Sequence, residues 1–169
     1  MAPQGRSRSS PERVLGSPCY PARVPISEAR MLEFRIPEPV ARAMTEHAQA
    51  EYPKECCGFL VGPPGEVREQ VKLTNVDPDP VMRYEADPKE MKRAYDDLFD
   101  RDWEVVAIYH SHTHTPAYPS PTDVKLARDP NAAYVLVSLQ DRSLPDLRAF
   151  RILEGRIEEL GVVSEEKAS

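Results

Sequence analysis

One stretch constrains the fold of this chain more than any other: Val105–Tyr109, followed at once by His-Ser-His-Thr-His at 110–114. A continuous apolar run rich in β-branched residues is typical of a buried strand. The histidines therefore lie where that strand runs into a loop. Because residues two apart on an extended backbone face the same side, His110 and His112 can direct their imidazoles to one point. The pattern predicts a metal site at the end of a central strand.

The third metal ligand has two candidates. A catalytic zinc usually takes three protein ligands and leaves one position open, and imidazole nitrogen and carboxylate oxygen are suitable donors. His114 can complete the set if the strand geometry persists, and Asp123 can complete it from further along the chain. Asp123 also fits a structural role, because Ser120-Pro121-Thr122-Asp123 has the composition of a helix start. Capping and ligation are compatible, since an acid in the first turn of a helix is well fixed.

The rest of the chain, from Met31, alternates strand patterns with helix patterns. Besides the central strand, we expect strands at 32–36, 57–62, 67–73, 83–86, 133–139, 147–153 and 156–163, the last two joined by a turn at Glu154-Gly155. We expect helices at about 38–50, from Pro88 to about Phe99, and at about 122–128. The second helix has a predicted core-facing stripe of Met91, Tyr95, Leu98 and Phe99. These elements predict an α/β domain, a mixed sheet with helices packed on it.

The ends of the chain differ from this pattern. Residues 1–30 contain five Pro, five Ser and five Arg against two Glu, without hydrophobic periodicity, so we predict a disordered tail. Its longest apolar run, Val14-Leu15, is too short for a secretory signal. The predicted domain spans 31–163, and residues 164–169 are expected to fray. Because the tail carries +3 of a total charge of −6, the remainder carries −9, and no nucleic-acid partner is expected.

The cysteines and the isolated histidine receive structural interpretations. Cys19, Cys56 and Cys57 are an odd number without framework spacing, which predicts reduced thiols in a cytoplasmic protein. Cys56 is expected to be a buried, inert thiol rather than a nucleophile, because no general base is assigned to it. His47 is expected at a contact between a helix and the core, since nothing near it in sequence offers a second ligand. No segment predicts a membrane span.

The metal-site residues carry a resemblance to a known family. His110-Ser111-His112, seven residues, Ser120, two residues and Asp123 resemble the His-x-His-x7-Ser-x2-Asp signature of JAMM (MPN+) metalloproteases. The segment 54–62 resembles the family segment that carries the catalytic glutamate before an apolar strand. The likeness runs from about Met31 to Val163 and is greatest to the bacterial Mec-type peptidases. The segments that resemble this branch are 108–113, 117–120, 122–127 and 134–138.

The resemblance implies a fold and a set of roles. The fold would be the JAMM/MPN, cytidine-deaminase-like one, with a curved, mixed, mostly antiparallel sheet flanked by helices. One Zn²⁺ per chain would be held by His110, His112 and Asp123, with Glu55 as general acid and base and Ser120 as the oxyanion donor. His114 and Ser111 are candidates for substrate contact; otherwise His114 would lie in a solvated loop and Ser111 would hydrogen-bond the backbone or a ligand's neighbours.

The resemblance also implies a substrate. Mec-type peptidases release cysteine from the C-terminus of a sulfur carrier protein, a small ubiquitin-like protein that ends in Gly-Gly. A deubiquitinase-like isopeptidase is the main alternative, although the stretch from Glu55 to Asp123 is short for the insertions that grip linked ubiquitin. A non-catalytic MPN scaffold would lack metal ligands, which this chain has. A nucleic-acid-associated, RadC-like protein would need a basic surface, whereas residues 31–169 are acidic.

Overall fold

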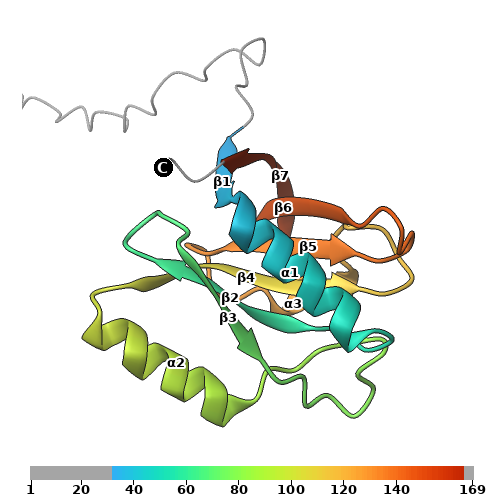
Figure 1. The fold of residues 1–169 in the computed structure, drawn as a ribbon, viewed down its shortest axis with the longest axis horizontal. Helices are drawn as coiled ribbons and strands as arrows, with labels where there is room; N and C mark the ends of the chain where they lie inside the picture. The colour runs from blue at the N-terminus through green and yellow to red at the C-terminus, as the bar shows by residue number, and fades with distance from the viewer. Residues whose placement is uncertain (1–31, 166–169) are drawn as a thin grey trace, which may run out of the picture. The chain divides into compact units, whose positions relative to one another are not determined.

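The computed structural model describes residues 32–165 (Figure 1). The predictions for residues 1–30 and 166–169, Cys19 included, lie outside the described residues. The strands are β1 (Glu33–Pro37), β2 (Cys57–Gly62), β3 (Glu69–Leu73), β4 (Glu104–His112), β5 (Ala133–Ser138), β6 (Asp146–Leu153) and β7 (Arg156–Glu165). The helices are α1 (Glu38–Glu51), α2 (Pro88–Asp100) and α3 (Pro121–Leu126).

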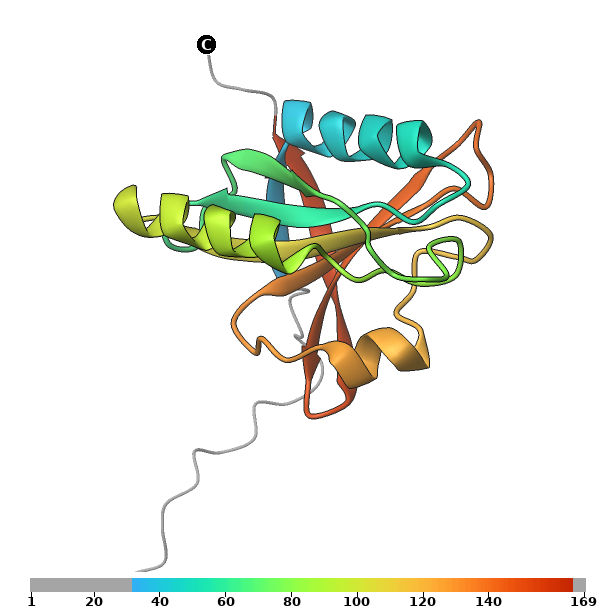
Figure 2. The same ribbon diagram turned by 90° about the horizontal axis from the view of Figure 1, so that it is seen from below.

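All seven strands belong to one sheet, in the order β1-β7-β6-β5-β4-β2-β3. The pairs β4–β5 and β1–β7 are parallel, and the other four neighbouring pairs are antiparallel. The sheet curls strongly, with α1 on one face and α3 on the other (Figure 2). The expected mixed, mostly antiparallel curved sheet is confirmed. β4 lies inside the sheet between β5 and β2, as the apolar run at 105–109 indicates, although the middle strand of the seven is β5.

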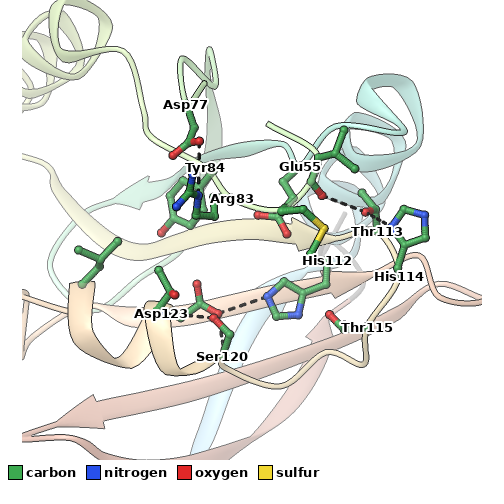
Figure 3. Close-up of a pocket in the computed structure, with 14 residues that line it drawn as sticks. Glu55, Asp77, Arg83, Tyr84, His112, Thr113, His114, Thr115, Ser120 and Asp123 are labelled. Carbon is green, nitrogen blue, oxygen red and sulfur yellow. Dashed lines mark hydrogen bonds and ion pairs between the residues drawn. The ribbon is translucent and has the colours of Figure 1, made fainter. Parts of the chain in front are cut away.

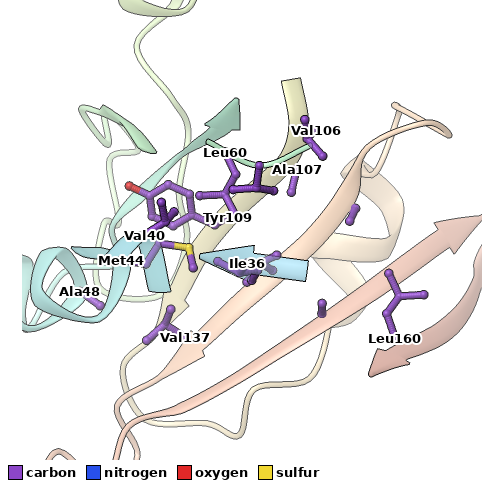
Figure 4. Close-up of a cluster of buried hydrophobic side chains, with 14 of the residues drawn as sticks. Ile36, Val40, Met44, Ala48, Leu60, Val106, Ala107, Tyr109, Val137 and Leu160 are labelled. Atoms are coloured by element: carbon purple, nitrogen blue, oxygen red, sulfur yellow. The ribbon is translucent and has the colours of Figure 1, made fainter. Parts of the chain in front are cut away.

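The face under α1 holds the largest apolar cluster (Figure 4). The helix begins directly after Pro37, with Pro39 in its first turn, where a missing N–H costs no helical hydrogen bond. Its buried side chains pack on residues of β2, β4 and β5; they are Val40, Met44 and Ala48 against Leu60, Ala107, Tyr109 and Val137. Removing this apolar surface from water stabilises the fold and fixes β4 against α1.

The opposite face is covered by α2 and α3. The predicted start of α2 is confirmed, because the Asp87 side chain accepts hydrogen bonds from the backbone N–H groups of Lys89 and Glu90. Its buried residues are Ala94 and Leu98, whereas Phe99 is 84% exposed. The prediction of a core-facing Phe99 is wrong, because residues adjacent in a helix point about 100° apart, and Phe99 lies beyond the contact line that Leu98 occupies.

The expected strand at 83–86 does not form. Only Ala86 makes a backbone bridge, to Asn75. For other backbone groups of the segment, the Asn75 side chain takes the place of a neighbouring strand. Its Nδ2 donates to the Arg83 carbonyl at 2.9 Å and its Oδ1 accepts from the Glu85 N–H at 3.1 Å. The segment between β3 and α2 is therefore a loop organised around one side chain.

Two element ends also differ from expectation. Helix α3 ends at Leu126 rather than near Arg128, since Ala127 has an extended backbone. Strand β7 continues through Glu165 instead of fraying at Ser164, because Ser164 and Glu165 pair with Ile36 and Pro37 of β1. Within residues 32–165, no helix has the length and apolar character needed to cross a membrane.

Candidate metal and catalytic site

The C-terminal end of β4 carries two buried histidines. His110 is 1% and His112 is 5% exposed, and their Nε2 atoms lie 3.1 Å apart. The alternation of the strand places both on the face that α2 and α3 cover. The His112 Nδ1 atom donates to the carbonyl of Pro116 at 2.9 Å. This bond directs the lone pair of the His112 Nε2 toward His110, the arrangement that a metal ligand needs.

Asp123 joins the two histidines from the first turn of α3. One carboxylate oxygen lies 3.2 Å from the His110 Nε2 and the other lies 3.3 Å from the His112 Nε2. The same side chain caps the helix, because its Oδ2 accepts from the Ser120 N–H at 2.7 Å while the Ser120 Oγ accepts from the Asp123 N–H at 3.2 Å. The predicted capping box is confirmed, and it holds Asp123 in place beside the histidines.

The three residues fit a tetrahedral metal ion. Their ligand atoms all lie within 4.8 Å of one another, and no other group of three such residues in the described chain comes together this way. Bonds of about 2.0–2.1 Å at tetrahedral angles separate ligand atoms by roughly 3.3 Å. The two histidine Nε2 atoms are close to this separation at 3.1 Å, and each lies 3.2–3.3 Å from one of the two Asp123 oxygens. Two imidazole nitrogens at 3.1 Å also need a proton or a cation between them, which a bound metal supplies.

Electrostatics give the cluster one anion and one neutral histidine. Burial alone would raise the pKa of Asp123, but its close contacts with His110 and His112 lower it well below its usual range. Burial lowers the pKa of His110, which keeps its imidazole neutral and its nitrogen available. For His112, burial is the largest single influence and opposes protonation, but the contacts with Asp123 and the Pro116 carbonyl and the charge of Glu55 together outweigh it, so its pKa is raised.

Glu55 faces the same pocket from the segment before β2 (Figure 3). It is only 7% exposed, and burial raises the pKa of its carboxyl to about 7. Its backbone is held at both ends, because its N–H donates to the Pro80 carbonyl at 2.7 Å and its carbonyl accepts from the Asn75 Nδ2 at 2.9 Å. The loop between β3 and α2 therefore positions Glu55.

The pocket has a volume of about 230 Å³ and brings most of the predicted site residues together. Glu55, His112, Ser120 and Asp123 line it, and His110 lies behind them, stacked on Tyr84 with ring centroids 4.5 Å apart. Tyr84 and Arg83 were not identified as site residues from the sequence, because they were assigned to a strand. The Arg-Tyr pair shortly before the Asp87-Pro88 helix start was the only available signal.

His114 and Ser111 lie in different surroundings. His114 is exposed at the pocket edge, where its Nδ1 is 2.7 Å from the Thr113 Oγ1, and it is not part of the ligand cluster. Ser111 is fully buried and its Oγ accepts from the Cys56 N–H at 2.8 Å. A substrate contact does not fit this burial, whereas the alternative expectation, a hydrogen bond to the backbone, does.

The two described cysteines are not reactive groups. Cys56 and Cys57 are both free and buried. Burial raises the pKa of the Cys56 thiol to about 11 and that of Cys57 to about 12, so both are protonated at neutral pH. The expectation that Cys56 is buried is confirmed, and its raised pKa agrees with the expectation of an inert thiol.

Fold and site together define a JAB/MPN-type domain with a His-His-Asp cluster that could hold a metal ion. The family model described as prokaryotic homologs of the JAB domain matches residues 37–153. The chain belongs to this family, as its JAMM/MPN+ signature indicates. A solved JAB1/MPN domain protein from Archaeoglobus fulgidus has the same fold, with a TM-score of 0.51 at 17% sequence identity over 79% of this chain and 99% of that one.

Two relatives of known name resemble the chain over most of their length. The CysO-cysteine peptidase of Mycobacterium tuberculosis is 43% identical over 122 residues, which cover 71% of this chain and 83% of that protein. A probable TtuB-protein conjugate cleaving protease of Thermus thermophilus is 36% identical over 125 residues, covering 74% and 80%. Both relatives are named as a peptidase or a protease, which supports a hydrolase.

Proposed function

We propose that this protein is a zinc-dependent metallopeptidase that hydrolyses the bond after the Gly-Gly C-terminus of a ubiquitin-like sulfur carrier protein and releases cysteine. One observation carries the proposal: the ligand atoms of His110, His112 and Asp123 converge at a pocket that Glu55 and Ser120 also line. The name of the Mycobacterium tuberculosis relative supports the choice of substrate.

Each residue has a defined task in amide hydrolysis. A zinc ion held by His110, His112 and Asp123 would polarise the scissile carbonyl and lower the pKa of a water molecule. Glu55 takes the proton of the attacking water and passes it to the leaving amine. A carboxyl whose pKa is raised to about 7 can accept and release a proton near neutral pH, as this task requires.

Ser120 stabilises the charge that develops on the carbonyl oxygen. Its Oγ already accepts a hydrogen bond from the Asp123 N–H, so its lone pair is used and its single hydroxyl proton remains for the pocket. A donor fixed in this way requires little reorganisation when the oxyanion forms.

A glycine-rich substrate tail suits the buried ligand cluster at this pocket. Two glycines let the backbone approach the ligand cluster closely. The folded body of the carrier would then bind outside the pocket.

An isopeptidase that removes a ubiquitin-like modifier from protein lysines is the second candidate. The name of the Thermus thermophilus relative, a protease of TtuB-protein conjugates, favours it. The two functions share the bond after Gly-Gly and differ in the leaving group.

Mass spectrometry of a chemically prepared carrier–cysteine adduct, incubated with the zinc-loaded protein, tests the proposal. We expect loss of one cysteine and no cleavage by the Glu55→Gln variant on the same time scale. An untouched adduct beside efficient cleavage of a lysine-linked conjugate would assign the second function. Failure to cleave either substrate would leave a non-catalytic domain.

A further inference from the structure

We propose that Arg83 binds the free α-carboxylate of the leaving amino acid and thereby selects a single released residue over a lysine side chain. The inference deepens the proposed function and rests on it. It concerns the loop between β3 and α2, which lies beside the pocket opposite α3 (Figure 3).

The charge balance of the pocket singles out Arg83. Among the described residues that line it, Glu55, Asp77 and Asp123 are acidic and Arg83 is the only lysine or arginine. A substrate carboxylate entering this pocket would meet three acids, so its binding requires compensation by fixed positive charge. Apart from the metal, Arg83 is the group that can supply it.

The guanidinium of Arg83 is oriented by Asp77 but keeps donors available for a ligand. Its Nε lies 3.6 Å from the Asp77 Oδ1, and its side chain is 55% exposed. Within residues 32–165, the Arg83 side chain donates no side-chain hydrogen bond, and its shortest ion-pair contact is made through Nε and not through the two terminal nitrogens. A guanidinium with its paired donors free matches the geometry of a carboxylate, which it can bind through two parallel hydrogen bonds.

The backbone beneath Arg83 is fixed. The Arg83 N–H donates to the Asp79 carbonyl at 3.1 Å, and the Arg83 carbonyl accepts from the Asn75 Nδ2 at 2.9 Å. The Asp77 Oδ1 in turn accepts from the Asp79 N–H at 2.8 Å. These bonds hold the start of the arginine side chain at the pocket before a substrate arrives, so little order has to be created on binding.

The positions of the other groups place the leaving group near Arg83. Ser120 and Arg83 lie on opposite sides of Asp123 in Figure 3, with Glu55 on the side of Arg83. The carbonyl oxygen and the leaving nitrogen are separate substituents of the reacting carbon. A substrate whose oxygen faces Ser120 can therefore direct its leaving nitrogen toward Glu55 and Arg83.

The two candidate substrates differ in the group attached to the scissile nitrogen. A released amino acid carries its carboxylate on the carbon next to the scissile nitrogen, whereas a lysine isopeptide has a methylene chain there. A charge-assisted, paired hydrogen bond to that carboxylate should favour the amino acid on the order of 10–100-fold in kcat/KM. Hydrolysis adds one water across the amide in either case, yielding the carrier carboxylate together with the free amino acid from one substrate and the lysine amine of the modified protein from the other.

The test compares a carrier–cysteine adduct with the matched carrier–cysteinamide adduct, which lacks only the negative charge. The zinc-loaded wild-type protein should prefer cysteine roughly 10–100-fold in kcat/KM. Arg83→Gln should reduce this preference to near unity through loss of activity on the cysteine adduct. Arg128→Gln, which changes an exposed arginine of the neighbouring cavity, is the control and should keep the preference.

Each other outcome overturns the inference in a recognisable way. Equal loss on both adducts in Arg83→Gln would show that Arg83 contacts the carrier instead. A wild-type protein that cleaves both adducts equally would exclude carboxylate recognition while leaving the proposed function intact. If neither adduct is cleaved, the proposed function fails as well. Thermal unfolding and zinc content of each variant show whether it is folded and loaded.

Discussion

Strand β4 presents alternate residues to two environments, with Tyr109 and Ser111 facing α1 and His110 and His112 facing the pocket. On the α1 face each polar group has a partner: the Tyr109 hydroxyl lies 2.8 Å from both the His47 Nδ1 and the Gln70 Nε2, and Ser111 accepts from the Cys56 N–H. On the pocket face, the Nδ1 of His110 is the one buried side-chain nitrogen or oxygen among the described residues without a partner.

The two faces of β4 therefore have different roles, one in stability and the other in function. Buried polar groups stabilise a fold only when they are paired, as they are on the α1 face. Close packing on the α1 face depends on a glycine. A Cβ at Gly58 would lie 2.5 Å from the Tyr109 ring and 2.3 Å from the Val71 carbonyl, so glycine allows the ring to lie on β2. The pocket face leaves nitrogen lone pairs close together, at a cost that a bound metal offsets.

The largest effect on zinc content and activity should come from removing a ligand on the pocket face. Asp123→Ala should abolish stoichiometric zinc, and the loss of activity should exceed the roughly 10–100-fold that follows from removing a hydrogen-bond partner of a ligand. Because Asp123 also caps α3, Asp123→Asn is the matched variant: its amide oxygen can still accept from the Ser120 N–H, but its charge is gone. Metal analysis by mass spectrometry and adduct turnover provide the measurements.

His114→Ala is the control for this prediction. The exposed imidazole lies outside the ligand cluster, so zinc content should stay at about one per chain. If His114→Ala loses zinc and Asp123→Ala keeps it, the three ligands are His110, His112 and His114.

A smaller effect on turnover, with zinc retained, should follow from Glu55→Gln. The substitution keeps the shape of the side chain but removes the proton acceptor, so turnover should fall by roughly 10²-fold or more. Single-turnover measurements on the zinc-loaded variant separate this loss from a change in metal content. Activity within a few-fold of wild type would remove Glu55 from the proposed mechanism.

The same substitution should stabilise the metal-free protein at high pH. Because the pKa of Glu55 is raised from 4.5 to about 7 by burial, the folded protein holds a proton in that interval that the unfolded chain has released. Stability therefore falls as pH rises from 4.5 to 7. At pH 8, metal-free Glu55→Gln should unfold with about 1–3 kcal/mol more free energy than wild type, and at pH 4 with almost the same. Urea unfolding at both pH values measures the difference.

Local sequence predicts the pairing of two histidines and the helix start that holds Asp123. Alternation along a strand and the composition of a helix start are short-range rules, and both hold for these residues. The family resemblance chose Asp123 over His114 as the third ligand and added Glu55, which no local pattern distinguishes from other acids. Its surroundings depend on the distant loop that hydrogen-bonds to it.

The loop itself was predicted incorrectly for a physical reason. Arg83-Tyr84-Glu85-Ala86 has strand-like composition, but the side chain of Asn75 satisfies the backbone groups that a neighbouring strand would have paired. Competition between a side chain and a strand for the same hydrogen bonds depends on three-dimensional placement, which strand propensity does not contain. The error concealed Arg83 and Tyr84, two of the residues that line the pocket.

The smallest effect on activity, with a clear effect on stability, should come from Tyr109→Phe. Gln70 donates through its Nε2, so the hydroxyl proton of Tyr109 goes to the Nδ1 of His47, whose pKa burial lowers and whose ring is therefore neutral. Phenylalanine leaves that buried nitrogen without a donor, and unfolding free energy should fall by about 1–3 kcal/mol. Zinc content should be unchanged and turnover should stay within a few-fold of wild type.

A second variant tests whether the loss comes from the unpaired nitrogen. In Tyr109→Phe combined with His47→Leu, no buried acceptor remains without a partner, and replacing both partners by apolar groups can be nearly neutral. The double variant should thus be less destabilised than the sum of the two single variants, which a double-mutant cycle in urea measures. If Tyr109→Phe instead lowers zinc affinity, the two faces of β4 are coupled through the strand, and the separation of stability from function does not hold.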